Sequence, residues 1–365
     1  MNKVLFKVHS TLALIFFLPI LVICLTGSVL VFKYELDRAL TPQRVSVEPD
    51  GNRQSLDTLI TTVRNIYPER EIVGWALFQD AARADLAYTI AHGNEEWNYL
   101  IIDQYRNRVI QPPAALDSYL TDWLLALHAE LLMGHTGFWI TSVMAIVLCV
   151  MGVSGFLLYR KFWKSLFLLR WRGRLVVYFS DLHKTVGIIS SPVLLVLGIT
   201  GGYWTISGVW HEMEEHAAGE QHHIVSGPLY NHALSVQQML EDAERNGMTA
   251  TYVSLPWEPD RSIGIYGDVQ SGNPLHSEYA SMQSFDSQTG VPKAFSDIRQ
   301  ADATVQVLDS FRNLHYGIFG GLLTRLIWCV IGAMPLLLSI TGGYLWWRRR
   351  DARRAKAARL RAALV

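Results

Sequence analysis

Four long stretches of the chain contain no Asp, Glu, Lys or Arg, and they limit what the chain can fold into more than any other feature. They cover residues 10–32, 136–159, 185–210 and 326–347. An apolar helix of about 20 residues crosses the hydrocarbon layer of a bilayer, and each stretch is longer than that. We therefore expect four transmembrane helices. The composition agrees with a membrane protein, since 50% of the 365 residues are hydrophobic and only 18% are charged.

The charges that flank these stretches predict their orientation. Residues 160–174 carry six Lys and Arg side chains and no acid, and residues 348–361 carry eight and one acid. Segments rich in Lys and Arg stay on the cytoplasmic side of a membrane. Both termini are then expected in the cytoplasm, and the polar segments 33–122 and 211–312 on the opposite face, which is the periplasm in a bacterium. The first stretch is long for a signal peptide and lacks a small-x-small cleavage site, so we expect it to remain as an anchor.

A histidine stands at the mouth of each apolar stretch, at a fixed spacing from a small hydroxyl residue followed by glycine. The spacing from His9 to Thr26-Gly27 equals the spacing from His183 to Thr200-Gly201. A longer spacing separates His128 from Ser154-Gly155, and it recurs between His315 and Thr341-Gly342. This recurrence predicts a tandem duplication in which each copy has two spans around a long polar segment. The hydroxyl-glycine pairs themselves are more typical of close helix packing than of a binding site.

The two polar segments share one order of elements. In the first, residues 55–67 have the period of an amphipathic helix, and residues 72–78, 86–90, 97–102 and 109–110 are strand-like. In the second, residues 236–243 predict a helix, residues 251–255, 262–266 and 283–285 predict strands, and Asp286-Ser287-Gln288-Thr289-Gly290 predicts a turn before Val291. We therefore expect two small α+β domains outside the membrane.

These motifs carry a resemblance to a known family. The helix-and-hairpin modules, with their Asp-x-x-Thr-Gly turn, resemble PepSY domains, and spans that open with Leu-His and carry Thr-Gly resemble the PepSY-associated transmembrane family over nearly the whole chain. Within that family the chain is similar to the di-haem ferric-siderophore reductases of the inner membrane. The resemblance implies two b-type haems that conduct electrons and reduce iron outside the cytoplasm.

The expected fold is a membrane α-helical bundle of four transmembrane helices, a tandem 2+2 repeat, with two α+β PepSY-like periplasmic domains. Its expected segments are a first transmembrane helix (1–34), a PepSY-like domain (35–117), an outer helix and second transmembrane helix (118–160), a basic cytoplasmic linker (161–180), a third transmembrane helix (181–210), a second PepSY-like domain (211–308), a fourth transmembrane helix (309–348) and a basic cytoplasmic tail (349–365).

The four histidines are the expected cofactor ligands. Neutral imidazole is a common axial ligand of haem iron, and ionisable residues at membrane depth are functional candidates. Each copy has an even number of spans, so the copies keep one orientation and equivalent residues face each other across a pseudo-twofold axis. His9 would then face His183, and His128 would face His315, each pair binding the iron of one non-covalent haem b. Helix capping or headgroup contact is the simpler interpretation of any one of these histidines.

Other residues compete for the same site or support it. His135 and His211 lie near the outer ends of their spans and could replace a ligand there. Arg325 could pair with haem propionates or reach lipid headgroups. With straight helices the two histidine levels would lie about 40 Å apart. The glycines at 134, 137, 317, 320 and 321 offer bends that shorten this distance, and Trp204 and Trp328 could bridge the remainder.

Residues 211–232 gather five histidines and several acids, which could hold a metal ion transiently or form a solvated acidic helix. The chain has no Walker loop, dinucleotide fingerprint or nucleophile elbow, so its electrons would come from a cytoplasmic reductase or quinol. We expect an inner-membrane b-type di-haem cytochrome, surrounded by lipid, that reduces periplasmic ferric siderophore and releases Fe(II), with no nucleic-acid partner. The alternatives are a non-redox PepSY-type binding or regulatory protein and a siderophore permease component.

Overall fold

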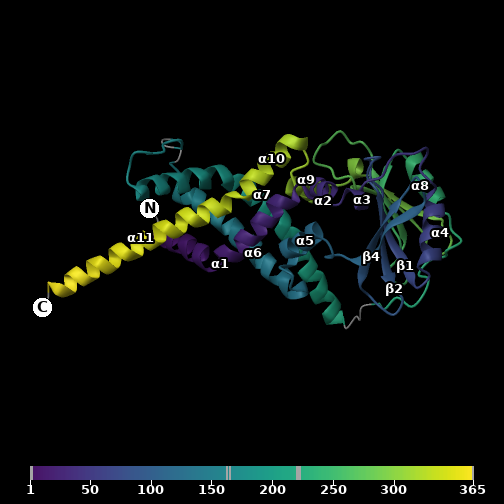
Figure 1. Cartoon of the computed structure of the whole chain (residues 1–365), viewed down its shortest axis with the longest axis horizontal. Helices are drawn as coiled ribbons and strands as arrows, with labels where there is room; N and C mark the ends of the chain where they lie inside the picture. The colour runs from purple at the N-terminus through teal and green to yellow at the C-terminus, as the bar shows by residue number, and fades with distance from the viewer. Residues whose placement is uncertain (1–2, 162, 164–165, 219–222, 364–365) are drawn as a thin grey trace. The chain divides into compact units, whose positions relative to one another are not determined.

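The computed structural model describes residues 3–161, 163, 166–218 and 223–363 (Figure 1). The chain divides into two compact units. The helical unit consists of Met1–Phe32, Leu124–Met213 and Leu314–Val365, and the sheet unit consists of Lys33–Trp123 and Glu214–Asn313. Each unit is therefore built from segments that are far apart in the sequence.

The helical unit contains the predicted spans. Its long helices are α1 (Lys3–Leu30), α6 (Gly134–Leu158), α7 (Leu175–Ala218), α10 (Gly321–Gly332) and α11 (Met334–Ala362). Four helical segments, Lys3–Leu30, Gly134–Leu158, Leu175–Glu214 and Gly321–Ala362, are long and apolar enough to cross a membrane. The prediction of four transmembrane helices is thus confirmed by length and composition.

The outer surfaces of these helices are apolar. Large hydrophobic side chains are exposed along them, for example Ile15 on α1, Ile146 on α6 and Leu323 on α10. Between the helices the contacts are made by small residues, since α6 approaches α7 where Gly198 faces Cys149 and Gly202 faces Ala145. Apolar surfaces of this extent are stable in lipid and not in water.

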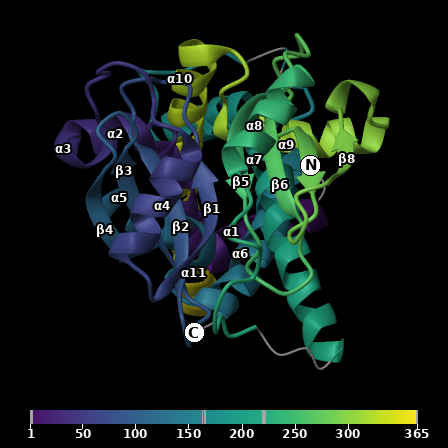
Figure 2. The ribbon, with the colours of Figure 1, turned by 90° about the vertical axis from the view of Figure 1, so that its right-hand side faces the viewer.

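The sheet unit holds one antiparallel sheet of eight strands, with the spatial order β4-β3-β2-β1-β5-β6-β7-β8. The strands are β1 (Arg70–Ala76), β2 (Asp85–Ala91), β3 (Trp97–Asp103), β4 (Arg108–Ala115), β5 (Thr249–Ser254), β6 (Ile263–Asp268), β7 (Ser281–Phe285) and β8 (Pro292–Ser296). Helices α4 (Leu56–Ile66) and α8 (Val236–Arg245) cover one face of the sheet (Figures 1 and 2). The short helices α2 (Lys33–Leu40), α3 (Pro42–Val45) and η2 (Ile298–Gln300) complete the unit.

Helices α4 and α8 form for the same local reasons. Each begins after a serine whose hydroxyl accepts a hydrogen bond from a backbone N–H in the first turn, Ser55 from Thr58 and Ser235 from Gln238. Each then places an apolar stripe on the sheet, and the stripe of α4 is Leu56, Leu59, Ile60 and Val63. The periodicity of both segments predicted these helices correctly.

The two predicted extracytoplasmic domains share one sheet and one core. Strand β1 of the first module pairs with β5 of the second, with Trp75 opposite Val253. The core beneath α4 and α8 contains fully buried side chains from both modules, including Trp75, Leu100, Ile263 and Phe285. The structure therefore differs from the sequence prediction, because the modules form a single compact unit instead of two separate domains.

Two further helices carry His128 and His315. These are α5 (Leu120–Glu130) and α9 (Ala303–Tyr316). Helix α5 stops at Glu130, Leu131 and Leu132 adopt positive φ, and α6 begins at Gly134 with φ +54°. Helix α9 stops at Tyr316, and Gly317 and Gly321, at φ +67° and +65°, precede α10. The predicted bends at these glycines are confirmed, since glycine adopts positive φ without steric cost.

Candidate functional site

The imidazoles of His128 and His315 lie together in the helical unit. Their ring centroids are 6.1 Å apart and the rings are inclined by 52°. A metal ion bonded at about 2 Å to one nitrogen of each ring, with each ring centre about 1.1 Å behind its nitrogen, would hold the two centroids about 6 Å apart. The observed separation therefore fits two imidazoles on opposite sides of one metal ion.

Each of the four histidines also meets the hydroxyl of one small-residue pair. The distance from the imidazole Nδ1 to the hydroxyl oxygen is 2.8 Å for His9 and Ser154 and 2.9 Å for His183 and Thr341. It is 3.3 Å for His128 and Thr26 and 2.9 Å for His315 and Thr200. His128 Nδ1 is also 2.8 Å from the carbonyl oxygen of Ile23. The hydroxyl residues thus bind histidines, a role that the sequence alone did not reveal.

The glycine after each hydroxyl residue leaves space for the imidazole. A Cβ atom built on Gly27 would lie 2.7 Å from His128 Cε1, and one on Gly201 would lie 2.8 Å from His315 Cε1. The corresponding distances are 3.2 Å from Gly342 to His183 and 3.6 Å from Gly155 to His9. The first two distances are shorter than non-bonded carbon atoms tolerate, so the His128 and His315 sites require glycine.

The other histidine pair is His9 on α1 and His183 on α7. Both rings are partly buried, and their Nδ1 atoms lie beside Ser154 of α6 and Thr341 of α11. The structure therefore brings together the expected pair His128 and His315, and the pairing of His9 with His183 stays a prediction. Whether these residues bind haem stays a prediction.

The helix breaks set the distance between the two pairs. His128 docks on Thr26 of α1, the helix that carries His9, and His315 docks on Thr200 of α7, the helix that carries His183. At about 1.5 Å per residue, α1 is about 25 Å long from His9 to Thr26, and α7 is about 25 Å long from His183 to Thr200. Continuous helices through α5 and α6 would have given about 40 Å, so the bends bring the pairs closer.

Gly137 shows why the chain can fold back at the first bend. A Cβ atom there would overlap the carbonyl oxygen of Glu130, the last residue of α5. Thr141 Oγ1 donates a hydrogen bond of 2.9 Å to the carbonyl of Ala129. The end of α5 is therefore held directly against α6.

Arg325 lies at the end of α1. Its Nη2 atom donates to the carbonyl oxygen of Val31 at 2.7 Å, and its guanidinium lies 4.5 Å from the ring centre of Phe32. The carbonyl groups in the last turn of a helix lack intrahelical partners, so this arginine caps α1. The predicted contact with a propionate stays a prediction.

The two alternative ligands, His135 and His211, have different surroundings from the four histidines described above. His135 Nδ1 lies 3.0 Å from a carboxylate oxygen of Glu212, and its side chain is 72% exposed. His211 is exposed on α7. His135 thus contacts a carboxylate, whereas each of the four other histidines contacts a hydroxyl.

The aromatic residues expected to form a bridge lie beside the His128–His315 pair. Trp204 meets the His315 ring edge to face at 5.2 Å, and Trp328 donates its Nε1 proton to the carbonyl of Leu314 at 2.6 Å. Trp204 follows Thr200 along α7, on the side away from His183. It therefore lies beyond the second histidine level, and the expectation that it bridges the two levels is wrong.

The acidic and histidine-rich segment 211–232, which begins in the last turns of α7, gives no metal site in the part of the chain that the structure describes. The side chains of residues 215–222, with Glu220 and His222 among them, lie outside the described residues. His232 instead donates from Nε2 to Glu71 at 3.0 Å, and His92 reaches the other oxygen of Glu71 at 3.2 Å. This carboxylate links the two halves of the sheet unit.

Burial raises the pKa of Glu71, but hydrogen bonds from His232 and His92 outweigh it and hold that pKa below the usual value for glutamate. Sequence reading missed this cluster because Glu71 and His92 lie in the first polar segment and His232 in the second, with two predicted spans between them. They become neighbours where the two modules join, through the pairing of β1 with β5 and the bridge between Asn94 and Val225.

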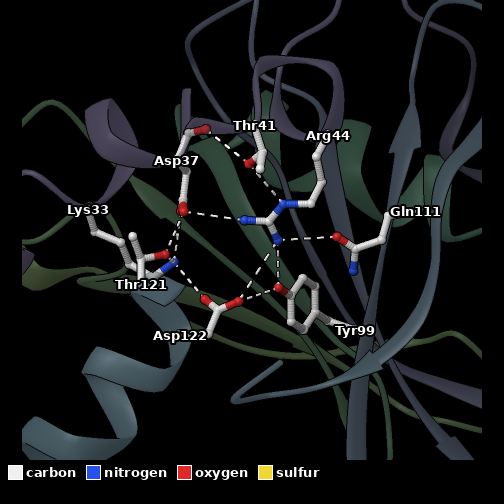
Figure 3. A network of polar contacts seen from close by, with 8 residues as sticks. All are labelled: Lys33, Asp37, Thr41, Arg44, Tyr99, Gln111, Thr121 and Asp122. Carbon is white, nitrogen blue, oxygen red and sulfur yellow. Dashed lines mark hydrogen bonds and ion pairs between the residues drawn. The ribbon is translucent and has the colours of Figure 1, made fainter. Parts of the chain in front are cut away.

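A second buried polar cluster in the sheet unit was also missed (Figure 3). We call it the Arg44 network, and its members are Lys33, Asp37, Thr41, Arg44, Tyr99, Gln111, Thr121 and Asp122. The Arg44 guanidinium bonds Tyr99, Gln111 and Asp37 at 2.9, 3.2 and 3.3 Å. Lys33 Nζ lies 2.9 Å from Asp37 and 2.7 Å from Asp122. The network joins the beginning of the first segment of the sheet unit, at Lys33, to the end of that segment, at Asp122.

Comparison with known proteins shows the family to which this chain belongs. A family model for the PepSY-associated TM region matches residues 6–349, which include the four histidines. The chain belongs to this family. Among its relatives, an uncharacterized protein of Pseudomonas aeruginosa strain PAO1, PA4219, is 37% identical over 84 residues. That stretch is 22% of this PepSY-associated transmembrane protein and 20% of the relative, so the two are similar over about a fifth of their lengths.

Proposed function

We propose that this chain is a di-haem b-type cytochrome of the bacterial inner membrane that reduces ferric siderophores in the periplasm. His9 and His183 would be the axial ligands of one haem b, and His128 and His315 those of the other. The observation that carries the proposal is the 6.1 Å separation of the His128 and His315 rings, each beside a glycine that clears its space.

A bound haem supplies one-electron chemistry, because its iron alternates between the ferric and ferrous states. The protein's part is to hold the imidazoles at a fixed separation and to exclude water with the apolar faces of its helices. Arg325 is the candidate partner of a propionate, since a guanidinium forms strong hydrogen-bonded pairs with carboxylates.

The substrate follows from the chemistry of iron release. Siderophores bind iron through hard oxygen atoms, which suit Fe(III) better than the softer Fe(II). One electron per iron therefore weakens the complex and frees Fe(II). The sheet unit would face the periplasm and dock the ferric complex, and a cytoplasmic reductase or quinol would supply the electrons.

The first test is the haem content of the purified full-length protein. We expect a Soret band that shifts on reduction with dithionite and two haems per chain. His128→Ala or His315→Ala should remove about one of them, and His9→Ala or His183→Ala the other. His135→Ala and His211→Ala are matched controls that should keep both haems, and a loss there would move the assignment of the ligands.

The second test separates the possible functions. Reduced protein mixed with a ferric hydroxamate complex should return to the oxidised spectrum while Fe(II) accumulates in a ferrous-specific chelator. Colourless protein would support a binding or regulatory role instead. Coloured protein that no ferric chelate oxidises would rule out transfer to iron while leaving haem binding intact, and transport of the intact complex would indicate a permease component.

A further inference from the structure

The hydroxyl groups that meet the four histidines have already committed their single protons. Thr26 donates to the carbonyl of Val22 at 2.8 Å, Thr200 to Val196 at 2.7 Å and Thr341 to Leu337 at 2.8 Å. Ser154 donates to the carbonyl of Met151 at 3.2 Å. These are bonds to the preceding turn of the same helix, as Ser and Thr commonly make in apolar helices.

A hydroxyl whose proton is used can only accept a second hydrogen bond. The partner of each hydroxyl oxygen is a histidine Nδ1, at 2.8 to 3.3 Å. The nitrogen must therefore carry the proton. His128 supports this independently, because its Nδ1 also lies 2.8 Å from the carbonyl oxygen of Ile23, which has no proton to give.

A neutral imidazole carries one proton, so a ring protonated at Nδ1 has a lone pair at Nε2. We propose that Thr26, Ser154, Thr200 and Thr341 are positioning residues that fix the Nδ1–H tautomer and present Nε2 of each histidine as an electron-pair donor. The inference rests on the proposed function for the identity of the acceptor, which is haem iron.

The hydrogen bond from Nδ1–H to the hydroxyl oxygen affects the iron as well as the ring. A hydrogen bond accepted from Nδ1–H makes the imidazole a stronger base at Nε2, and a stronger base favours ferric over ferrous iron. Loss of the hydroxyl should therefore weaken haem binding about 10- to 100-fold. It should also raise the midpoint potential of that haem, by about 59 mV for each tenfold loss of preference for the ferric state.

Helix α7 offers a matched set of variants. Thr200→Val removes the acceptor beside His315 while keeping the shape of the side chain, and Thr200→Ser keeps the acceptor. Thr205→Val removes a hydroxyl that bonds the carbonyl of Gly201 at 3.4 Å, one turn later on the same helix. We expect a weaker and higher-potential haem in Thr200→Val, wild-type values in Thr205→Val and recovery in Thr200→Ser.

A readout that needs no haem completes the test. Nitrogen-15 NMR of full-length protein, labelled in its imidazoles and prepared without haem, should report His315 protonated at Nδ1 in the wild type and altered in Thr200→Val. Protonation of wild-type His315 at Nε2 would overturn the inference, as would an unchanged potential in Thr200→Val. If the wild type binds no haem the proposed function fails, and the NMR result still decides the tautomer.

Discussion

Gly27 and Gly201 face imidazoles more closely than the two other glycines that follow hydroxyl residues. A side chain at either position would displace the ring of His128 or His315, because the Cβ would lie 2.7 or 2.8 Å from Cε1. At Gly155 the same atom would lie 3.6 Å from His9, which is ordinary contact. The glycines beside the His128–His315 pair therefore tolerate an added side chain less well than Gly155 beside His9.

We expect Gly27→Ala and Gly201→Ala to lose the haem of the His128–His315 pair, because overpacking by one methyl group costs about 1–3 kcal/mol and is relieved here by moving the ring. Haem per chain, measured from the reduced spectrum, should fall by about half. Gly155→Ala should keep both haems. Gly343→Ala, where a Cβ meets no described atom within 4 Å, is the control, and equal losses in all four variants would contradict this account.

At these residues the sequence predicted the pairing of His128 with His315, but not the hydroxyl residues that contact the histidines. The spacing of His128 to Ser154-Gly155 recurs in His315 and Thr341-Gly342, which is a property of the predicted repeat. The actual contact of His128 is with Thr26, 102 residues away. It depends on how α5 docks on α1, and no local pattern encodes that.

Helix α2, helix α3, strand β3 and helix α5 are tied together by the Arg44 network of the sheet unit (Figure 3). Asp37, Arg44 and Asp122 are all less than 9% exposed. Burial and then the hydrogen bond to Asp122 raise the pKa of the Tyr99 hydroxyl. Charged groups buried this far are stable only while each has its partner.

Arg44→Ala should destabilise the sheet unit by about 3–5 kcal/mol, because it leaves Asp37 and Asp122 with one cation instead of two in a buried site. The measurement is the urea midpoint of full-length protein in detergent, followed by tryptophan fluorescence. Arg261→Ala is the control, since that guanidinium pairs with Glu258 at an exposed site and such pairs contribute about 0–1 kcal/mol. A similar effect of both substitutions would show that the buried network adds no stability.

The helix breaks before α6 and α10 illustrate what the sequence can predict at the scale of elements. Gly134 stands at the same spacing after His128 as Gly321 after His315, and both glycines adopt positive φ. Glycine in an otherwise helical, apolar segment signals this conformation. The further turn of the chain at Leu131 and Leu132, both at positive φ, carries no such signal, because leucine rarely adopts it.

The two modules of the sheet unit join at the pairing of β1 with β5, and Gly74 lies in that pairing opposite Ser254. A Cβ at Gly74 would overlap the hydroxyl of Tyr252. The strand-like runs at residues 72–78 and 251–255 predicted both strands, but either could have been at the edge of a sheet. An edge strand and a central strand have the same hydrophobic pattern when both faces of the sheet are covered. The sequence was therefore compatible with two separate domains, whereas the chain forms one unit.

Gly74→Ala should lower the stability of the whole sheet unit by about 1–3 kcal/mol, because the methyl group must displace the partly buried side chain of Tyr252 on the partner strand. We expect one cooperative transition, shifted to lower temperature, for probes in both modules. Gly227→Ala, where a Cβ meets no described atom within 4 Å, should leave it unchanged. Unfolding of the first module alone would show that the modules are independent.

Glu71 ties the same two modules through His92 and His232, and its lowered pKa makes that link sensitive to pH. A carboxyl whose pKa is lower in the folded state than in the unfolded chain, where it is about 4.3, stabilises the fold above that value. The stabilisation is lost as the pH falls through the folded pKa. The difference in melting temperature between wild type and Glu71→Gln should thus be largest near neutral pH and shrink below about pH 4.3.

Glu69→Gln is the matched control for this experiment, because its carboxylate is 61% exposed and it precedes Glu71 closely in the same segment. It should change stability by less than about 0.5 kcal/mol at any pH. His232→Gln, which keeps a donor but removes the imidazole, should reduce the pH dependence without abolishing it, since His92 still donates to the other oxygen. A Glu71→Gln difference that stays constant from neutral pH down to about pH 3, well below the unfolded pKa, would mean that the carboxylate charge does not hold the modules together.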